Sequence, residues 1–280
     1  MGTLEIDSKK YKDEGYAIVK SFFSEPEVLD INRSVDNLQP KAFIPYTNTP
    51  LGYGNLLGDE NFKQIYENNT ISRFCKDFLT ENFTFNHLIV HNKPAWVGIG
   101  HEWHQESINI RSFAPGLEWN NSWKDFVQVF IPLDRHSLEN GCLKIIPGSH
   151  KLGLLEHEDI VAGHFGHKRR IKESELERAL ESSYILNCEL EPGDLLVFNH
   201  LIAHGSSNNN SGKRRRVAVM QARRDDFKKD SGILSREMQY RVDFTINSLA
   251  KKLDNLKTQR EKYYEEVTKY TLKSREDNEN

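Results

Sequence analysis

The sequence is short of cysteine, of strong net charge and of long apolar runs. Only Cys75, Cys142 and Cys188 occur in 280 residues, and no two of them form a C-x-x-C pair. We therefore expect buried cysteines in a reducing compartment, and neither a disulfide framework nor a cysteine metal site. The 38 basic and 41 acidic residues give a net charge of -3, which argues against a nucleic-acid binder.

No stretch approaches the run of about 18 apolar residues that a membrane helix needs. The first residues, MGTLEIDSKK, lack the apolar core of a signal peptide, and Ile6 stands where a myristoylation signal has Ser or Thr. The sequence thus predicts a cytoplasmic protein that acts on neither membranes nor nucleic acids.

The composition differs along the chain, so the average hydrophobic content describes no single region well. Hydrophobic residues make up 37%, which is low for a compact domain, yet 15 Phe and 10 Tyr argue against disorder. Near the N-terminus, Tyr16–Val19 has the pattern of a strand. Residues 25–38 have that of a helix that begins after Ser24 as N-cap, with Pro26 in its first turn.

Residues 86–225 are rich in short β-branched runs. Asn-Gly at 140–141 and Pro-Gly at 147–148 and 192–193 punctuate them, and the predicted strands cover 85–90, 126–133, 142–146, 195–198 and 217–222. This pattern predicts a mainly β fold with flanking helices, built on a double-stranded β-helix or jelly-roll core. Residues 150–183 are polar and are predicted to form an insertion or lid.

The C-terminal region has a different periodicity. Between residues 242 and 270 the apolar positions alternate in steps of four and three, with no Gly or Pro from 235 to 279. We expect a domain over 1–234 and a separate charged helical extension over 235–280. Two interpretations of the extension are open: a parallel coiled coil that forms a homodimer through the 242–270 heptads, or one long helix that folds back.

Two clusters of histidines could hold a metal ion. His104 and Glu106 stand at i and i+2, so in an extended segment both side chains point to one face. The segment 199–206, which contains His200 and His204, directly follows a predicted strand. Two imidazoles and one carboxylate form the facial triad that leaves three metal positions open, as in non-haem Fe(II) oxygenases. The H-x-E dyad alone is a weak signal.

The basic run of residues 213–216 gives a second indication. Strand residues alternate between faces, so one arginine, such as Arg215, can point inward while its neighbours stay solvated. A buried arginine needs an anion, and a dicarboxylate that chelates a metal at its other end would supply one. The alternative is a solvated basic cluster or a nucleic-acid contact.

Several motifs occur in a fixed order: residues 11–19, Lys93-Pro94, 103–106, Ile131–Asp134, the block ENGCLKIIPGSHK at 139–151, Gly193-Asp194, and His204–Ser206 followed by Arg215. On these motifs the chain resembles the phytanoyl-CoA dioxygenase family of Fe(II)- and 2-oxoglutarate-dependent oxygenases over most of residues 10–225. The block at 139–151 is the most specific part.

The resemblance implies roles for residues at the matching positions. His104, Glu106 and His204 would bind Fe(II), and Arg215 would bind the distal carboxylate of 2-oxoglutarate with help from Ser206. The further candidates for cosubstrate binding are His91, His87, Ser107 and Lys93. For His91 and His87, a hydrogen-bonded position within the sheet is the alternative.

The resemblance also implies a reaction, in which O2 and 2-oxoglutarate are consumed, succinate and CO2 are released, and a C–H bond is hydroxylated. The family commonly has Asp where this chain has Glu106; a retained carboxylate disfavours halogenation, because related halogenases have a small residue there. The basic segment 163–172 predicts a small substrate with a carboxylate or phosphate, unless it is only a solvated loop. Residues 43–55 are a second candidate for the wall of the substrate site.

Two functions of other classes are also compatible with the sequence. One is a non-catalytic protein that binds a metal or 2-oxoglutarate. The other is an assembly protein that acts through its C-terminal coiled coil.

Overall fold

The computed structural model describes residues 5–40, 42–44, 49–106, 126–160 and 169–224. Its helices are α1 (Ser8–Glu14), α2 (Glu25–Asp36), α3 (Lys63–Tyr66), α4 (Asn69–Phe78) and α6 (Glu173–Leu180), with 3-10 turns η1 (Glu60–Phe62) and η2 (Ser149–Leu152). Its strands are β1 (Tyr16–Val19), β2 (Ala42–Ile44), β3 (Thr49–Tyr53), β4 (Phe83–Lys93), β5 (His101–His104), β6 (Phe126–Pro132), β7 (Leu143–Ile145), β8 (His157–Asp159), β9 (Arg169–Ile171), β10 (Leu186–Cys188), β11 (Leu195–Asn199), β12 (His204–Ser206) and β13 (Arg215–Arg224).

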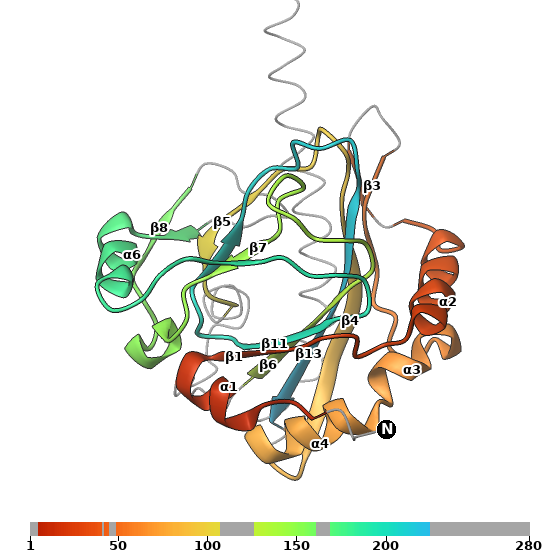
Figure 1. The fold of residues 1–280 in the computed structure, drawn as a ribbon, viewed down its shortest axis with the longest axis horizontal. Coiled ribbons are helices and arrows are strands. Elements are labelled where there is room, and N and C mark those ends of the chain that lie inside the picture. The colour runs from red at the N-terminus through yellow and green to blue at the C-terminus, as the bar shows by residue number, and fades with distance from the viewer. Residues whose placement is uncertain (1–4, 41, 45–48, 107–125, 161–168, 225–280) are drawn as a thin grey trace, which may run out of the picture.

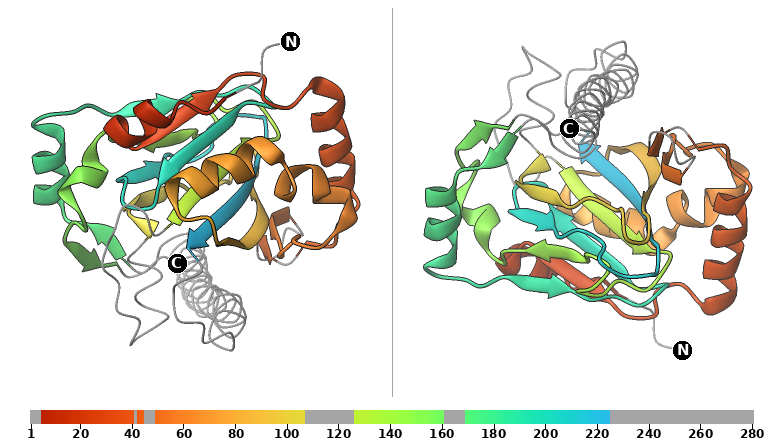
Figure 2. Two further views of the ribbon diagram at one scale, coloured as in Figure 1. Left: turned by 90° about the horizontal axis from the view of Figure 1, so that it is seen from below. Right: turned by 90° about the horizontal axis from the view of Figure 1, so that it is seen from above.

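The strands form two facing antiparallel sheets (Figure 1). The major sheet has seven strands in the order β1-β11-β6-β13-β4-β3-β2, and the minor sheet has four in the order β10-β7-β12-β5. The β8-β9 hairpin and α6 lie at one end of the molecule, and α2 lies at the other (Figure 2). The predicted mainly β architecture is confirmed, and it has the form of a jelly roll.

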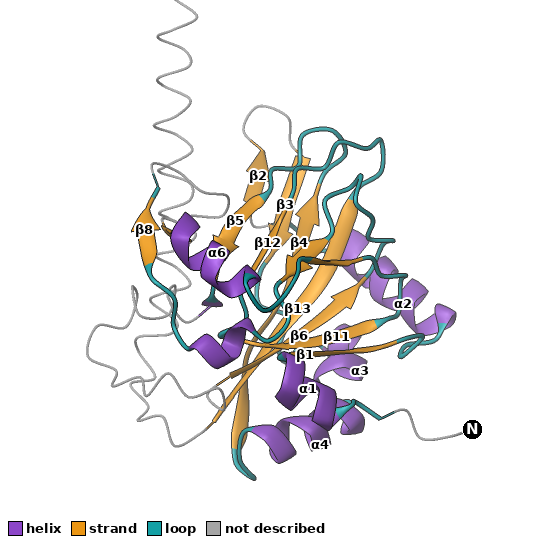
Figure 3. Ribbon diagram, turned by 60° about the vertical axis from the view of Figure 1, so that its left-hand side comes forward, coloured by secondary structure: helices purple, strands orange, loops and turns teal. Residues whose placement is uncertain are grey.

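Alternation along the strands separates two hydrophobic cores. Val129 on β6 and Met220 on β13 point to the outer face, where they pack with Tyr11, Ile31 and Phe74 from the helices. Figure 3 shows α1 to α4 gathered against this side of the major sheet. Residues one position along, including Phe130 and Val217, point inward and pack against Leu143 and Ile145 of the minor sheet. The site described below lies between the two sheets.

Most local predictions hold. Ser24 is the N-cap of α2, where Glu27 accepts a hydrogen bond from the Ser24 backbone N–H at 2.7 Å, and the helix ends at Asp36 rather than at residue 38. The five predicted strands in residues 86–225 correspond to β4, β6, β7, β11 and β13. All three cysteines are buried and free.

Some predictions fall outside the described residues. The C-terminal helix over 235–280, its heptads at 242–270 and residues 161–168 of the polar insertion are among them. The rest of the insertion forms η2, β8, β9 and α6. Within the described ranges, no helix has the length and apolar character required to cross a membrane.

Candidate active site

Three potential metal ligands converge between the two sheets. His104 ends β5 and His204 begins β12, and the two residues are direct partners across these strands. Glu106 follows β5 and places its Oε1 3.7 Å from Nε2 of His104 and 3.3 Å from Nε2 of His204. The ligand atoms all lie within 4.8 Å of one another, as a shared metal ion requires.

Both imidazoles are held in the same way. Nδ1 of His104 lies 2.7 Å from the carbonyl oxygen of Glu102, and Nδ1 of His204 lies 3.0 Å from that of Ile202, in each case two residues earlier. A carbonyl only accepts, so Nδ1 carries the proton and the Nε2 lone pair of each ring faces the centre of the cluster. The backbone N–H of Glu106 donates to His200 O at 3.1 Å, which fixes the third ligand.

The protonation states of Glu106 and His204 are those needed to bind a metal cation. Burial would raise the pKa of Glu106, but its contacts with the imidazoles of His104 and His204 hold that pKa well below its ordinary value. Burial, together with the neighbouring His104, lowers the pKa of His204. A carboxylate beside a neutral imidazole is the form in which these side chains bind a metal ion.

A cavity of about 90 Å³ adjoins the three residues. Its polar lining is formed by the cluster and by His91, His101, Gln128, Ser206 and Arg215, and its apolar lining by Phe130, Leu143, Phe198, Val217 and Val219. Because the cavity lies between the two sheets, charges in its lining interact more strongly than they would in bulk water.

Arg215 brings a positive charge to the lining of this cavity. Its side chain is buried, and within the described part of the chain its Nε and Nη1 have no hydrogen-bond partner. Burial lowers the pKa of Arg215 to about 10, so the guanidinium remains charged at neutral pH. A buried, unpaired guanidinium is costly in free energy, and a carboxylate in the cavity would offset that cost.

Ser206 is in the same lining as Arg215, and its hydroxyl is oriented by two donors. Lys93 donates from Nζ to Ser206 Oγ at 2.8 Å, and the backbone N–H of His101 donates to the same oxygen at 3.2 Å. Since both lone pairs of Oγ are engaged, the hydroxyl proton remains to be donated to another acceptor. Ser206 and Arg215 can therefore bind one carboxylate together.

Only one of the other predicted cosubstrate-binding residues lines the cavity among the described residues. His91 lines the cavity, whereas His87 and Lys93 do not. Lys93 is buried behind Ser206 and also donates to Ser207 O at 2.6 Å and Gly141 O at 3.3 Å. Ser107 lies outside the described residues.

Two lining residues were missed from the sequence. Gln128 is the only polar side chain in the strand FVQVFIP, and an amide at an inward position of a buried strand is a usable signal. His101 lies three residues before His104. It was missed because only the H-x-E pair, His104 and Glu106, was considered in this segment.

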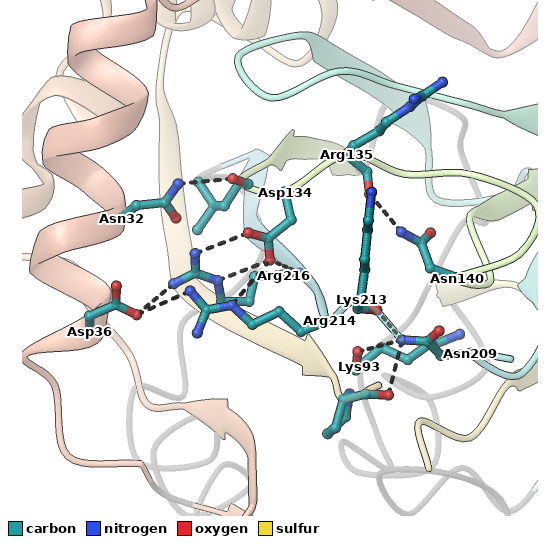
Figure 4. Close-up of polar contacts among 12 residues, drawn as sticks. Asn32, Asp36, Lys93, Asp134, Arg135, Asn140, Asn209, Lys213, Arg214 and Arg216 are labelled. Carbon is teal, nitrogen blue, oxygen red and sulfur yellow. Dashed lines mark hydrogen bonds and ion pairs between the residues drawn. The ribbon is translucent and has the colours of Figure 1, made fainter. Parts of the chain in front are cut away.

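One expectation about the basic run is wrong. Arg215 does point inward, and Arg214 is half exposed, but Arg216 is buried rather than solvated. Its guanidinium donates to both carboxylate oxygens of Asp134, each at 3.0 Å, and to Asp36 at 2.8 Å (Figure 4). These two acids compensate the charge that Arg216 carries into the outer face of the sheet.

The basic insertion gives no support for anion binding. Arg169 pairs with Asp159 at 2.8 Å and Arg170 with Glu158 at 2.6 Å across the β8-β9 hairpin, and all four side chains are exposed. Lys168 lies outside the described residues. The charges of this hairpin therefore largely balance one another.

The two-sheet fold and the His-Glu-His cluster define a class, the mononuclear non-haem oxygenases. The family model described as phytanoyl-CoA dioxygenase (PhyH) matches residues 11–217, and the chain belongs to that family. It is thus a member of a family of Fe(II)- and 2-oxoglutarate-dependent dioxygenases.

Two curated proteins are similar in sequence. The probable alpha-ketoglutarate-dependent hypophosphite dioxygenase of Stutzerimonas stutzeri is 28% identical over 184 residues, which are 62% of this chain and 62% of that protein. The dioxygenase lolE1 of Epichloe uncinata is 34% identical over 81 residues, 29% of this chain and 26% of that one. The chain thus spans less than two thirds of the length of either relative.

Solved structures share the fold. EctD from S. alaskensis with bound Fe superposes with a TM-score of 0.66 at 16% identity, over 82% of this chain and 81% of that one. Its complex with 2-oxoglutarate and 5-hydroxyectoine gives 0.63 at 17% identity, over 81% and 79%. The epimerase SnoN with Fe3+, alpha ketoglutarate and nogalamycin RO gives 0.59 at 15% identity, over 77% and 81%.

Proposed function

We propose that this protein hydroxylates a C–H bond of a small molecule, using Fe(II), 2-oxoglutarate and O2. The observation that carries the proposal is the shared cavity, whose lining contains the three converging ligands and the unpaired Arg215. His104, Glu106 and His204 would hold the iron, and Arg215 with Ser206 would hold the distal carboxylate of 2-oxoglutarate.

The bound iron and cosubstrate would supply the oxidising power, with 2-oxoglutarate and O2 converted to succinate and CO2 as oxygen is transferred to the substrate. The protein's own part is to orient and to exclude water. The carbonyls of Glu102 and Ile202 fix the ring planes of His104 and His204, and Phe130, Leu143 and Phe198 keep the cavity apolar.

Glu106 supports hydroxylation over halogenation. Its carboxylate already lies within reach of both imidazoles, so the coordination position that a halide would take is filled by the protein. The side chain is longer than the Asp common in the family, and its distances of 3.3 Å and 3.7 Å to the two imidazoles support a role for Glu106 as the third ligand.

Succinate formation tests this function. The wild-type protein is expected to release succinate only when Fe(II), 2-oxoglutarate and O2 are all present, slowly without substrate and faster with it. Arg215→Met is expected to raise the KM for 2-oxoglutarate about 100-fold or more, since a charge-assisted bidentate contact is lost. The matched control is Arg214→Met, because Arg214 is exposed and should leave the KM unchanged.

The same assay separates the competing functions. A non-catalytic binding protein would bind 2-oxoglutarate but release no succinate under any condition. An assembly protein would be insensitive to Arg215→Met in its biological role and would lose that role when residues 235–280 are removed. Either result would overturn the proposal.

A further inference from the structure

Strand β13 carries three buried arginines, and they differ in what surrounds them. Arg215, Arg216 and Arg223 are 4%, 3% and 8% exposed. Arg216 is paired with Asp134 and Asp36 on the outer face of the sheet. Arg215 is unpaired on the inner face, where the cosubstrate carboxylate explains it. Arg223 needs a separate explanation.

Arg223 points to the same inner face as Arg215. Val217 and Val219, which lie between them at alternate positions, line the cavity. The neighbouring strand β6 confirms the direction, because its inward residue Gln128 is the register partner of Gln221, and Phe126 is that of Arg223. Arg215 and Arg223 thus lie at opposite ends of one face, roughly 26 Å apart between Cα atoms at about 3.3 Å per residue.

Arg223 has no partner within the described ranges. Its side chain takes part in no hydrogen bond and no ion pair there, and its Nε is fully buried. Gln128 Nε2, which lines the cavity two strand positions nearer the metal cluster, is likewise a buried donor without an acceptor. Leaving buried donors unsatisfied is costly, and the cost is larger for a guanidinium than for an amide because the guanidinium is charged.

Gln221 lies opposite Gln128 on β13, two residues before Arg223, and adds a third donor. Asn86 donates from Nδ2 to Gln221 Oε1 at 2.9 Å, so the acceptor end of this amide is already used and its NH2 group remains. The inner face beyond the metal cluster is therefore rich in donors, with no carboxylate from the described chain beside Arg223.

We infer that Arg223, with Gln128 and Gln221, binds an oxyanion of the substrate at the end of the inner face opposite Arg215. This inference rests on the proposed function and adds the substrate class: a small molecule with a carboxylate or a phosphorus oxyanion. Arg223 is not in the lining of the cavity itself: it is about 13 Å along the strand from Val219, and its side chain shortens that gap.

Anion binding to the anaerobic Fe(II)·2-oxoglutarate protein tests the inference. The probes are acetate, hypophosphite and inorganic phosphate, titrated by calorimetry, and their comparison distinguishes a carboxylate site from a phosphorus-oxyanion site. We expect at least one probe to bind wild type, with an affinity reduced about 10-fold to 100-fold by Arg223→Met and less by Arg223→Lys. Arg224→Met is the matched control, because the next residue of the strand points to the opposite face.

Unfolding gives a second readout that needs no ligand. Arg223→Met removes an uncompensated buried charge, so its melting temperature in the absence of anions should equal or exceed that of wild type. A structural arginine would behave in the opposite way, with a lower melting temperature and unchanged anion affinity.

The outcomes separate this inference from the proposed function. Suppose that wild type and Arg223→Met both bind 2-oxoglutarate. If neither protein then binds a probe, or if both bind the probe with equal affinity, the inferred oxyanion site does not exist and the proposed function stands. If wild type does not bind 2-oxoglutarate with Fe(II), the proposed function is wrong and this inference with it.

Discussion

Lys93 donates a hydrogen bond from Nζ to Oγ of Ser206 at 2.8 Å, across 113 residues of sequence. Lys93 therefore acts on the cavity only through Ser206. It lies behind the cavity wall and orients the Ser206 hydroxyl, which faces the cavity. This arrangement also places the Lys93 amine near Arg215, its register partner across β4 and β13.

Lys93→Met should weaken 2-oxoglutarate binding about 10-fold, because Ser206 loses the donor that orients it. Ser206→Ala should have an effect of similar size, and the double variant should bind no more weakly than the weaker single variant. The dissociation constants of the four proteins, measured by anaerobic titration with Fe(II), form the cycle.

Lys213→Met serves as the control for removing a lysine, because Lys213 is exposed near the start of β13. Additive losses in the double variant would contradict the account, since they would mean that Lys93 acts on the cosubstrate independently of Ser206.

The affinity for 2-oxoglutarate should fall as pH rises above about 6. Burial, followed by the nearby Arg215, lowers the pKa of Lys93 to about 6, although Cys142 opposes this shift. At pH 7.5 the amine is thus largely neutral before binding. A carboxylate bound beside it raises this pKa, so binding takes up a proton and is favoured at lower pH.

Calorimetry at pH 7.5 in two buffers of different ionisation enthalpy measures this proton uptake, which should disappear in Lys93→Met. The same lowered pKa predicts that the unliganded fold gains stability as pH rises from about 6 towards 10.5, because the unfolded chain holds more protons in that window. Equal heats in the two buffers for wild type would contradict this prediction.

Asp134→Ala should destabilise the fold by about 3–5 kcal/mol, because it leaves the buried Arg216 without its two-oxygen partner. Asp36→Ala should cost about 1 kcal/mol or less, since Asp36 is 53% exposed and Asp134 still pairs with Arg216. Urea unfolding of the two variants measures the difference. Equal losses would show that the ion pair with Asp134 is not the dominant compensation.

The parts of the site that local spacing determines could be predicted from the sequence. His104 and Glu106 are two residues apart, and an extended segment brings both to one face. The turn residues and apolar runs likewise delimited five strands of the major sheet (β1, β4, β6, β11 and β13), but only β7 of the minor sheet. The family motifs added His204 and Arg215, which spacing alone left among alternatives.

Contacts between distant segments could not be predicted. Arg216 was expected in solvent because its acids, Asp134 and Asp36, lie 82 and 180 residues away. Lys93 was assigned to the cosubstrate, but its Nζ contacts Ser206 because β4 ends beside the loop after β12. In each case the sequence shows the charge and only the fold shows what compensates it.

The most direct test of the central claim is anaerobic addition of Fe(II) and 2-oxoglutarate, with the visible charge-transfer band of the chelate as the signal. Wild type should develop the band at one equivalent of each, and His204→Ala should not, while Arg214→Met should behave as wild type. Absence of the band in wild type, or its persistence in His204→Ala, would contradict the account.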